Sequence, residues 1–474
     1  MSRDVNRELL ELAAFGPEEL EEFYPQWLEA TQKLQMTDEV VENAVDHYIP
    51  DHWQIQYLGI RKMIGAYLRE IVELTKTTEY KKQGRKIVYG IPPAIGNYYY
   101  AAKLVGGDRI FVGMPDVTLT NALNGFFHGT APFLNKAEQS GLNYGCRHCA
   151  LNKMRYAAIL GGVIAAPDII WSWGFNCDEG PKTDEFIQRM VGKQWNFHVS
   201  RLPHDSRFDE DEDQMTDRLR FLSDELRLGV SKIEEACGIK ISDEDLEKAN
   251  KVYNGYRFKL GMLTNTVAMA NPPILDGESM NLLSSVVGSM FASLNYMEDA
   301  IDTLLKELKA AVKKGEGIMP KDTPKIGYYD LPVALPWISK TFRDNGVLPI
   351  FSLAQTVTDD LLAPTKFPDD PWMASAESWS RMSVTKNLRG EAEATLKKIK
   401  QIKADGIVLG LYDFDRWMGA QHKMLAQMLN EKAGVPVYYI EGDVWDDREY
   451  SEEAMKTRIE SLCQIIINRK AALG

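Results

Sequence analysis

The chain has 474 residues, too many for a single hydrophobic core, so we expect two or three domains. Its composition, 45% hydrophobic and 26% charged, is that of an ordinary globular protein, and its net charge of −13 argues against a nucleic-acid-binding surface. No stretch approaches the ~20 apolar residues of a membrane span, and five cysteines in so long a chain indicate a reducing cytoplasm rather than a disulfide framework.

The pattern of apolar residues divides the chain into four segments. Residues 1–82 have helical periodicity and few strand signals, so we expect a helical N-terminal segment. Residues 83–214 contain four short apolar runs, at 86–90, 109–113, 168–173 and 195–199, separated by helical stretches. Residues 215–320 are again largely helical. Residues 321–474 carry a second set of four runs, at 325–329, 347–351, 406–410 and 435–440.

Each set of runs predicts a four-stranded parallel sheet of Rossmann or flavodoxin type. The runs are apolar on both sides and bounded by Gly, Pro or Asp, as buried parallel strands are. Because both sets share the same order of turns and helices, we predict an α/β fold with two duplicated domains whose third strands are equivalent. Cys177 and the segment from Asp413 to Asp415 then follow matching strands, at the edge where open α/β sheets bind ligands.

Cys146, Cys149 and Cys177 are the candidate metal ligands. The first two have the CxxC spacing that lets thiolates on one turn reach the same ion, and residues 144–155 are typical of a loop entering a helix. A helix N-terminus favours anionic thiolates. Three cysteines are one short of a closed four-thiolate site, so either one iron stays open or another ligand completes the set. A zinc site and buried thiols without a metal are the alternatives.

His128 and His148 are the candidate catalytic residues. His148 and its neighbour Arg147 offer hydrogen-bond donors to cluster sulfurs. His128 could reach the site as an acid or base, or it could be a loop histidine bonded to backbone, and His422 is open to the same two interpretations. Neither a G-x-G-x-x-G nor a Walker A sequence is present, so we expect any use of ATP to belong to a partner.

Two groups of short motifs carry a family resemblance. They are Cys149 to Lys153, Gly161, Asp168-Ile-Ile, and Cys177-Asp with Lys182 in the first half, and residues 405–408, 435–437, 440–443 and 457–460 in the second half. In order and spacing they resemble the 2-hydroxyacyl-CoA dehydratase and benzoyl-CoA reductase family, over roughly residues 85 to 474.

The resemblance implies a heterodimer of two related subunits, each with paired α/β domains that hold a [4Fe–4S] cluster. It also implies a separate ATP-dependent iron–sulfur activator that delivers single low-potential electrons. The substrate would be an acyl-CoA whose thioester carbonyl meets a cluster iron without a cysteine ligand. One-electron reduction of that carbonyl would give a ketyl radical, from which a 2-hydroxyacyl-CoA loses its leaving group or an aromatic ring is reduced.

The chain departs from the family pattern at one ligand. Family members usually supply a third cysteine just after the third strand of the second domain, and residues 412–419 contain none. We expect Cys146 to replace it. A carboxylate from Asp415 or Asp413 is the second choice, since carboxylates bind iron, and loss of the cluster is the third.

The resulting hypothesis is a [4Fe–4S] subunit of an anaerobic radical dehydratase or reductase of CoA thioesters. The alternatives are a low-potential reductase of a small molecule without CoA, and a non-catalytic or electron-relay partner subunit. The sequence does not separate dehydratase from aromatic reductase. The aromatic segments 97–100 and 171–175 could line a flat pocket, but aromatic residues at strand ends are more often part of the core.

Overall fold

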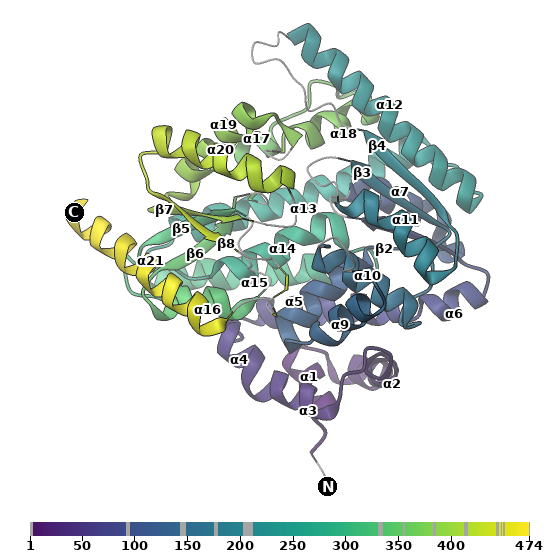
Figure 1. Ribbon diagram of the computed structural model, residues 1–474, viewed down its shortest axis with the longest axis horizontal. Coiled ribbons are helices and arrows are strands. Elements are labelled where there is room, and N and C mark those ends of the chain that lie inside the picture. The colour runs from purple at the N-terminus through teal and green to yellow at the C-terminus, as the bar shows by residue number, and fades with distance from the viewer. Residues whose placement is uncertain are drawn as a thin grey trace.

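The computed structural model describes residues 3–91, 95–142, 148–174, 179–201, 212–329, 335–353, 356–382, 385–411, 416–441, 445–446, 448 and 451–473. These residues form two four-stranded parallel sheets, with a helical segment between them in the chain and helices before the first sheet (Figure 1). The predicted α/β fold with two duplicated sheets and helical N-terminal and middle segments is confirmed.

The N-terminal segment contains six α-helices and one short π-helical turn among its described residues. They are α1 (Val5–Leu12), α2 (Pro17–Lys33), α3 (Asp38–Asn43), η1 (Ala44–Tyr48), α4 (Ile49–His52), α5 (Leu58–Thr75) and α6 (Thr77–Lys82). The middle segment consists of α12 (Glu212–Cys237), α13 (Asp243–Met269), α14 (Gly277–Ser289) and α15 (Leu294–Lys314).

Helices α5 and α15 join these two segments by capping each other. The Glu307 carboxylate of α15 accepts hydrogen bonds from the first backbone N–H groups of α5, at 2.8 and 2.9 Å. The buried Glu70 carboxylate of α5 accepts the N–H groups of Phe291, Ala292 and Ser293 at the start of α15. Carboxylates at helix N-termini satisfy unpaired N–H groups and complement the helix dipole. The two helices are therefore antiparallel and fixed at both ends.

The first sheet has the strand order β2-β1-β3-β4. Its elements are β1 (Lys86–Ile91), α7 (Gly96–Gly106), η2 (Gly107–Arg109), β2 (Ile110–Gly113), α8 (Pro115–Ala122), η3 (Leu123–Phe127), α9 (Ala131–Gln139), α10 (Ala150–Leu160), β3 (Ile169–Gly174), α11 (Glu179–Val191) and β4 (Asn196–Arg201). Strand β1 is buried from its second residue onward, as expected for a central parallel strand covered on both faces.

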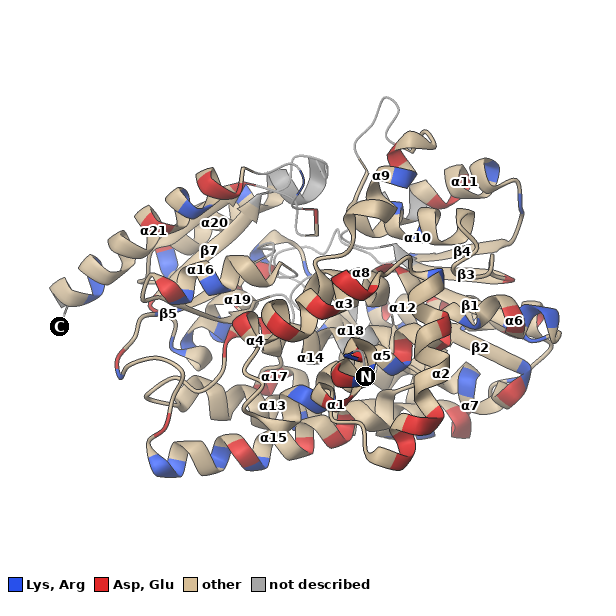
Figure 2. Cartoon of the chain, turned by 90° about the horizontal axis from the view of Figure 1, so that it is seen from below, with Lys and Arg blue, Asp and Glu red and all other residues tan. Residues whose placement is uncertain are grey.

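The second sheet repeats this order as β6-β5-β7-β8. Its elements are β5 (Lys325–Tyr329), α16 (Pro336–Asp344), β6 (Leu348–Ser352), α17 (Asp359–Leu362), α18 (Pro371–Ser380), α19 (Leu388–Ile402), β7 (Gly406–Leu411), α20 (Arg416–Lys432), β8 (Val437–Glu441) and α21 (Glu452–Leu473). Figure 2 shows the second sheet with α20 and α21 on the left and the first sheet with α9–α11 on the right.

One aspartate in each unit marks the equivalence of the third strands. Asp168 precedes β3, and its carboxylate accepts a 2.8 Å hydrogen bond from the backbone N–H of Ile87 at the start of β1. Asp405 precedes β7 and accepts the N–H of Lys325 at the start of β5, also at 2.8 Å. The same side-chain contact therefore aligns the first and third strands in both halves, as a duplication requires.

A continuous hydrophobic core runs from the N-terminal helices through both sheets, from Val5 to Val437. The divisions at residues 82, 214 and 320 remain predictions. Among the described helices, none combines the length and the apolar character that crossing a membrane requires.

Candidate functional site

The strand order places a ligand-binding edge at the carboxyl ends of the central strands. The connection from β1 runs to β2 on one side, whereas β3 lies on the other side of β1. The crevice outside such a reversal is where open parallel sheets bind ligands. In the first sheet this point lies between Ile91 and Gly174, the last residues of β1 and β3. In the second sheet it lies between Tyr329 and Leu411, the last residues of β5 and β7.

Cys149 is held at the start of a helix in the crossover that leads to β3. It is the N-cap of α10, and its carbonyl accepts the first helical hydrogen bond, from Lys153 N–H at 3.1 Å. Its side chain is buried, with 8% exposed. The unpaired N–H groups and dipole at this helix end favour the thiolate form of a cysteine. The helix predicted from residues 144–155 onward is thus present, and Cys149 stands at its N-terminus.

Side-chain contacts join the start of α10 to α11, the helix that follows Cys177 in the chain. The His148 Nδ1 lies 3.4 Å from the Thr183 hydroxyl of α11, and the Asn152 amide donates to the same hydroxyl at 3.2 Å. Thr183 is fully buried. The start of α10 is therefore fixed against the helix that follows β3.

Cys146, Cys177, Asp413 and Asp415 lie outside the described residues, so the predicted ligand set remains a prediction. Within the described ranges, no three His, Cys, Asp or Glu side chains gather as metal ligands.

A buried network of charged side chains joins α10 to its neighbours α8 and α11. Arg155 of α10 donates to Asp116 of α8 at 2.8 Å and lies 3.7 Å from Asp184 of α11, and all three side chains are 0% exposed. Burial raises the pKa of Asp116 to about 6, against the lowering effect of Arg155. Asp184 also accepts a 2.9 Å hydrogen bond from the indole of Trp195. Removing any one of these charges leaves another buried without full compensation, so the network fixes the orientation of α10.

Four charged residues join the two α/β units and are called the seam below: Glu138, Lys153, Asp446 and Arg448. The Lys153 ammonium lies 2.7 Å from Glu138 and 3.9 Å from Asp446. The Arg448 guanidinium contacts Glu138 at 2.7 Å and Asp446 at 2.6 Å. Burial opposes ionisation of Glu138, but the hydrogen bonds from Arg448 and Lys153 prevail and lower its pKa. Asp446 and Arg448, which follow β8, therefore pack against α9 and α10.

His128 lies at the junction of three parts of the chain. It ends η3 in the left-handed region, with φ +50°, and its ring stacks on Tyr48 of η1 with centroids 5.6 Å apart. Asn124, one turn earlier, donates to the carbonyl of Trp445 at 2.8 Å. His128 is exposed at this junction. Its role as an acid or base stays a prediction.

The edge of the second sheet carries a polar cluster. The Tyr329 hydroxyl at the end of β5 donates to Glu391 of α19, and the Gln421 amide of α20 donates to the same carboxylate. His422 is buried, with Nδ1 2.8 Å from the Gly410 carbonyl and its ring against Tyr329 at 4.9 Å. His422 thus fits the interpretation of a backbone-bonded histidine.

Lys398 extends this cluster and was missed by the sequence reasoning. Its ammonium donates to the Leu353 carbonyl after β6, and burial lowers its pKa to about 8, with Glu391 acting in the opposite direction. The sequence signal is the spacing, because Glu391, Thr395, Lys398 and Ile402 recur at the interval that places them on one helix face. In the structure all four are buried. Polar residues on the buried face of a helix indicate a hydrogen-bonded site.

Comparison with known proteins decides the family. A family model described as "2-hydroxyglutaryl-CoA dehydratase, D-component" matches residues 99–466, which is more than half of the chain. The chain belongs to this family. The resemblance to CoA-thioester dehydratases and benzoyl-CoA reductases is thereby confirmed. The matched region contains the second sheet, the first sheet without β1, helix α10 and the seam.

The known proteins that the chain matches are distant from it in sequence. One of the benzoyl-CoA reductase subunits of Thauera aromatica is 26% identical over 199 residues, which is 39% of this chain and 46% of that protein. The alpha subunit of lactoyl-CoA dehydratase of Anaerotignum propionicum is 23% identical over 269 residues, 53% of this chain and 59% of that protein. The beta subunit of the same enzyme is 24% identical over 265 residues, 52% of this chain and 64% of that protein. The matches thus span about half to two thirds of these relatives.

The aromatic segments 97–100 and 171–175 supply three fully buried side chains. Tyr98, Tyr99 and Trp171 are 0% exposed and belong to one core cluster. The Tyr99 hydroxyl donates to the Trp171 carbonyl, and the Trp171 indole donates to Ser200 at 2.9 Å. These side chains fit the core interpretation, and Phe175 lies outside the described residues.

Proposed function

We propose that the chain is an iron–sulfur subunit of an enzyme that acts on CoA thioesters, of the dehydratase or benzoyl-CoA reductase type. The observation that carries the proposal is the position of Cys149, buried at the N-terminus of α10 and joined through His148 and Thr183 to the helix after β3. The N-terminus of α10 and the start of the helix after β3 both lie at the edge where parallel sheets bind ligands. The family membership and the names of the relatives support a thioester substrate.

Cys146, Cys149 and Cys177 would hold a [4Fe–4S] cluster, with Asp415 as the alternative fourth ligand. Thiolate donors near a helix N-terminus suit such a cluster. When bound, the cluster would supply low-potential one-electron chemistry, of the kind that would reduce a thioester carbonyl to a ketyl radical. The chain's own contribution would be to stabilise the thiolates through α10, to hold His148 by its bond to Thr183, and to offer His128 for proton transfer. A homologous second subunit and an ATP-dependent activator are the expected partners.

The second candidate function is an electron-relay or non-catalytic subunit of such an enzyme. It is favoured by the absence of cysteine from residues 412–419 and by nearly equal similarity to the alpha and beta subunits of lactoyl-CoA dehydratase, at 23% and 24% identity.

Iron content of single-cysteine variants tests the proposal. Anaerobically purified chain should hold about four irons. Cys149→Ser, Cys146→Ser and Cys177→Ser should each lose most of this iron and its visible absorption. Cys237→Ser is the matched control, because Cys237 lies at the far end of α12 and packs against the hydrophobic core. Iron content that is unchanged in all three variants would overturn the ligand assignment.

Turnover separates the two candidate functions. The complex with its partner subunit and activator would be assayed anaerobically with benzoyl-CoA and several 2-hydroxyacyl-CoAs. Loss of turnover in Cys149→Ser, with normal assembly, supports a catalytic or relay cluster in this subunit. Full turnover by an iron-free chain assigns it a scaffolding role instead.

A further inference from the structure

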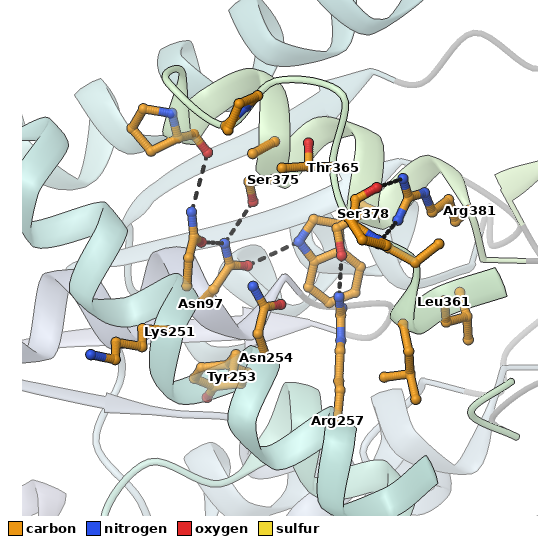
Figure 3. Close-up of a pocket in the computed structure, with 18 of the residues that line it drawn as sticks. Asn97, Lys251, Tyr253, Asn254, Arg257, Leu361, Thr365, Ser375, Ser378 and Arg381 are labelled. Atoms are coloured by element: carbon orange, nitrogen blue, oxygen red, sulfur yellow. Dashed lines mark hydrogen bonds between the residues drawn. The ribbon is translucent and has the colours of Figure 1, made fainter. Parts of the chain in front are cut away.

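A large pocket lies between α13, α18 and the segment that follows α17 (Figure 3). Its volume is about 720 Å³, within the range of small-molecule sites. Besides the buried Tyr253, the α13 wall carries Glu247, Asn250, Lys251, Asn254, Arg257 and Phe258. These positions recur every three or four residues, the spacing at which a helix packed against protein would present apolar side chains. Five of the six side chains are polar, so this face of α13 is suited to a polar ligand.

Asn97 of α7 organises the floor of the pocket. Its amide nitrogen donates to Asn250 and to Ser375, both at 2.7 Å, and its amide oxygen accepts the Trp379 indole N–H at 2.9 Å. Asn250 donates in turn to the Pro371 carbonyl at 3.1 Å. Three helices are thereby fixed around one side chain, and the orientation of the Trp379 ring is set before any ligand binds.

Arg257 stands on this fixed indole without a carboxylate partner among the described residues. Its guanidinium lies 4.5 Å from the centre of the Trp379 ring and donates to the Ser378 hydroxyl. Burial lowers its pKa to about 10, and the opposing contribution comes from Tyr253 rather than from a carboxylate. Arg381, across the pocket, is different because it pairs with Glu377 at 2.9 Å and donates to the Pro364 carbonyl. Arg257 is thus a preorganised cation, and one Ser378 hydroxyl leaves most of the five guanidinium N–H donors for a ligand.

We propose that this pocket binds an organic phosphate, with the phosphate on Arg257. A guanidinium presents a fork of N–H donors that matches phosphate oxygens, and stacking on an indole keeps that fork in place. Lys251 lines the same wall and is exposed, so a group with nearly two negative charges suits the site better than a single carboxylate. Glu247 and Asp369, the acids of the lining, are both exposed to solvent.

The body of the ligand would lie on the apolar part of the pocket. Phe258, Leu361 and Leu362 line it, and Phe258 is 57% exposed. The phosphate has two possible sources. One is the nucleotide end of a CoA thioester, which rests on the proposed function, and the other is a free organic phosphate, which does not.

Calorimetry on the full chain tests the proposal with coenzyme A, adenosine 5′-diphosphate and uncharged adenosine. A phosphate-bearing probe should bind and adenosine should not. Arg257→Gln should weaken that binding about tenfold or more, and Arg257→Lys should restore part of it. Lys248→Gln is the matched control, since it removes a cation from α13 outside the pocket and should change affinity less than about twofold.

Binding of coenzyme A that adenosine 5′-diphosphate displaces assigns the pocket to the nucleotide end of the thioester, whereas coenzyme A that binds without being displaced lies elsewhere and overturns the proposal. Binding of the diphosphate alone assigns it to a free organic phosphate. Equal binding of adenosine, full binding by Arg257→Gln, or failure of both phosphate probes overturns the proposal. None of these measurements depends on iron or turnover, so the failure of this inference and the failure of the proposed function are distinguishable.

Discussion

The seam between the two α/β units gives the sharpest test of how the candidate site is held. Glu138→Gln removes the carboxylate that binds both Lys153 and Arg448, and Lys153→Met removes one of the two cations while keeping side-chain length. We expect Glu138→Gln to destabilise the protein more. It leaves the Lys153 ammonium, 4% exposed, with Asp446 at 3.9 Å as its one carboxylate partner in the described part of the chain, whereas Lys153→Met leaves Glu138 with Arg448 at 2.7 Å.

The magnitude follows from distance and exposure. Two charges 2.7 Å apart attract by about 6 kcal/mol at an effective dielectric constant of about 20, before desolvation is subtracted. Breaking a buried pair costs about 3–5 kcal/mol, and the 27% exposure of Glu138 reduces this through solvent screening. We therefore expect losses of about 3 kcal/mol for Glu138→Gln and about 2 kcal/mol for Lys153→Met, with a coupling energy of about 1–2 kcal/mol.

Urea unfolding of the two single variants and the double variant measures that coupling. The pair Lys456 and Glu452 is the matched control, because its charged atoms are 2.6 Å apart but 45% and 60% exposed, and its coupling should be about 0.3–0.5 kcal/mol. Since the pKa of Glu138 is lowered in the folded state, its contribution is present at neutral pH and is lost as the pH falls through that lowered pKa. Additive losses at the seam, or equal coupling in both pairs, would refute the reasoning.

Three further outcomes are expected. Gly229→Ala should destabilise the protein by about 1–3 kcal/mol, because a Cβ at this position would lie 2.1 Å from the Trp171 ring. Gly255→Ala should stabilise α13 by up to about 1 kcal/mol, because no atom lies within 4 Å of where its Cβ would be, and thermal unfolding ranks the two variants. The pKa of Asp116 is raised from 3.8 to about 6 by folding, so the native carboxyl binds a proton more tightly than the unfolded one, and its contribution to stability falls as the pH rises from about 4 to about 6. The stability of Asp116→Asn relative to wild type should therefore rise over the same pH interval. Urea unfolding measures this difference, and a difference that does not change with pH contradicts the prediction. Thr183→Val removes the hydroxyl that joins His148 and Asn152 to α11. The purified variant should lose iron several-fold faster than wild type during gel filtration, while its circular dichroism stays unchanged. Equal iron retention speaks against this role of Thr183.

The sheets were predictable because their signal is local. Each strand is a short apolar run bounded by Gly, Pro or Asp, and β1, β5 and β7 begin at the predicted residues. The duplication was predictable because the order of turns and helices repeats, and the paired contacts of Asp168 and Asp405 show the repeat in atomic detail.

The contacts that hold the candidate site were not predictable, because they join residues far apart in the chain. Glu138 and Arg448 are separated by 310 positions, and in sequence each looks like a solvated charge on a helix or loop. Glu70, which caps α15, is equally ordinary in sequence although it is fully buried. The interpretation of Tyr98 and Tyr99 needed their burial, since a core aromatic and a pocket aromatic have the same local pattern.

The reciprocal capping of α5 and α15 has a consequence for how the protein can be dissected. A fragment that starts at β1 would lose Glu70 and expose the start of α15, and a fragment that ends before α15 would lose Glu307 and expose the start of α5. The Leu304 backbone also lies only 2.6 Å from where a Cβ on Gly59 would be, so no other side chain fits in place of that glycine. We expect neither duplicated half to fold when expressed alone. Two copies of one ancestral unit have become mutually dependent through helices that belong to neither sheet.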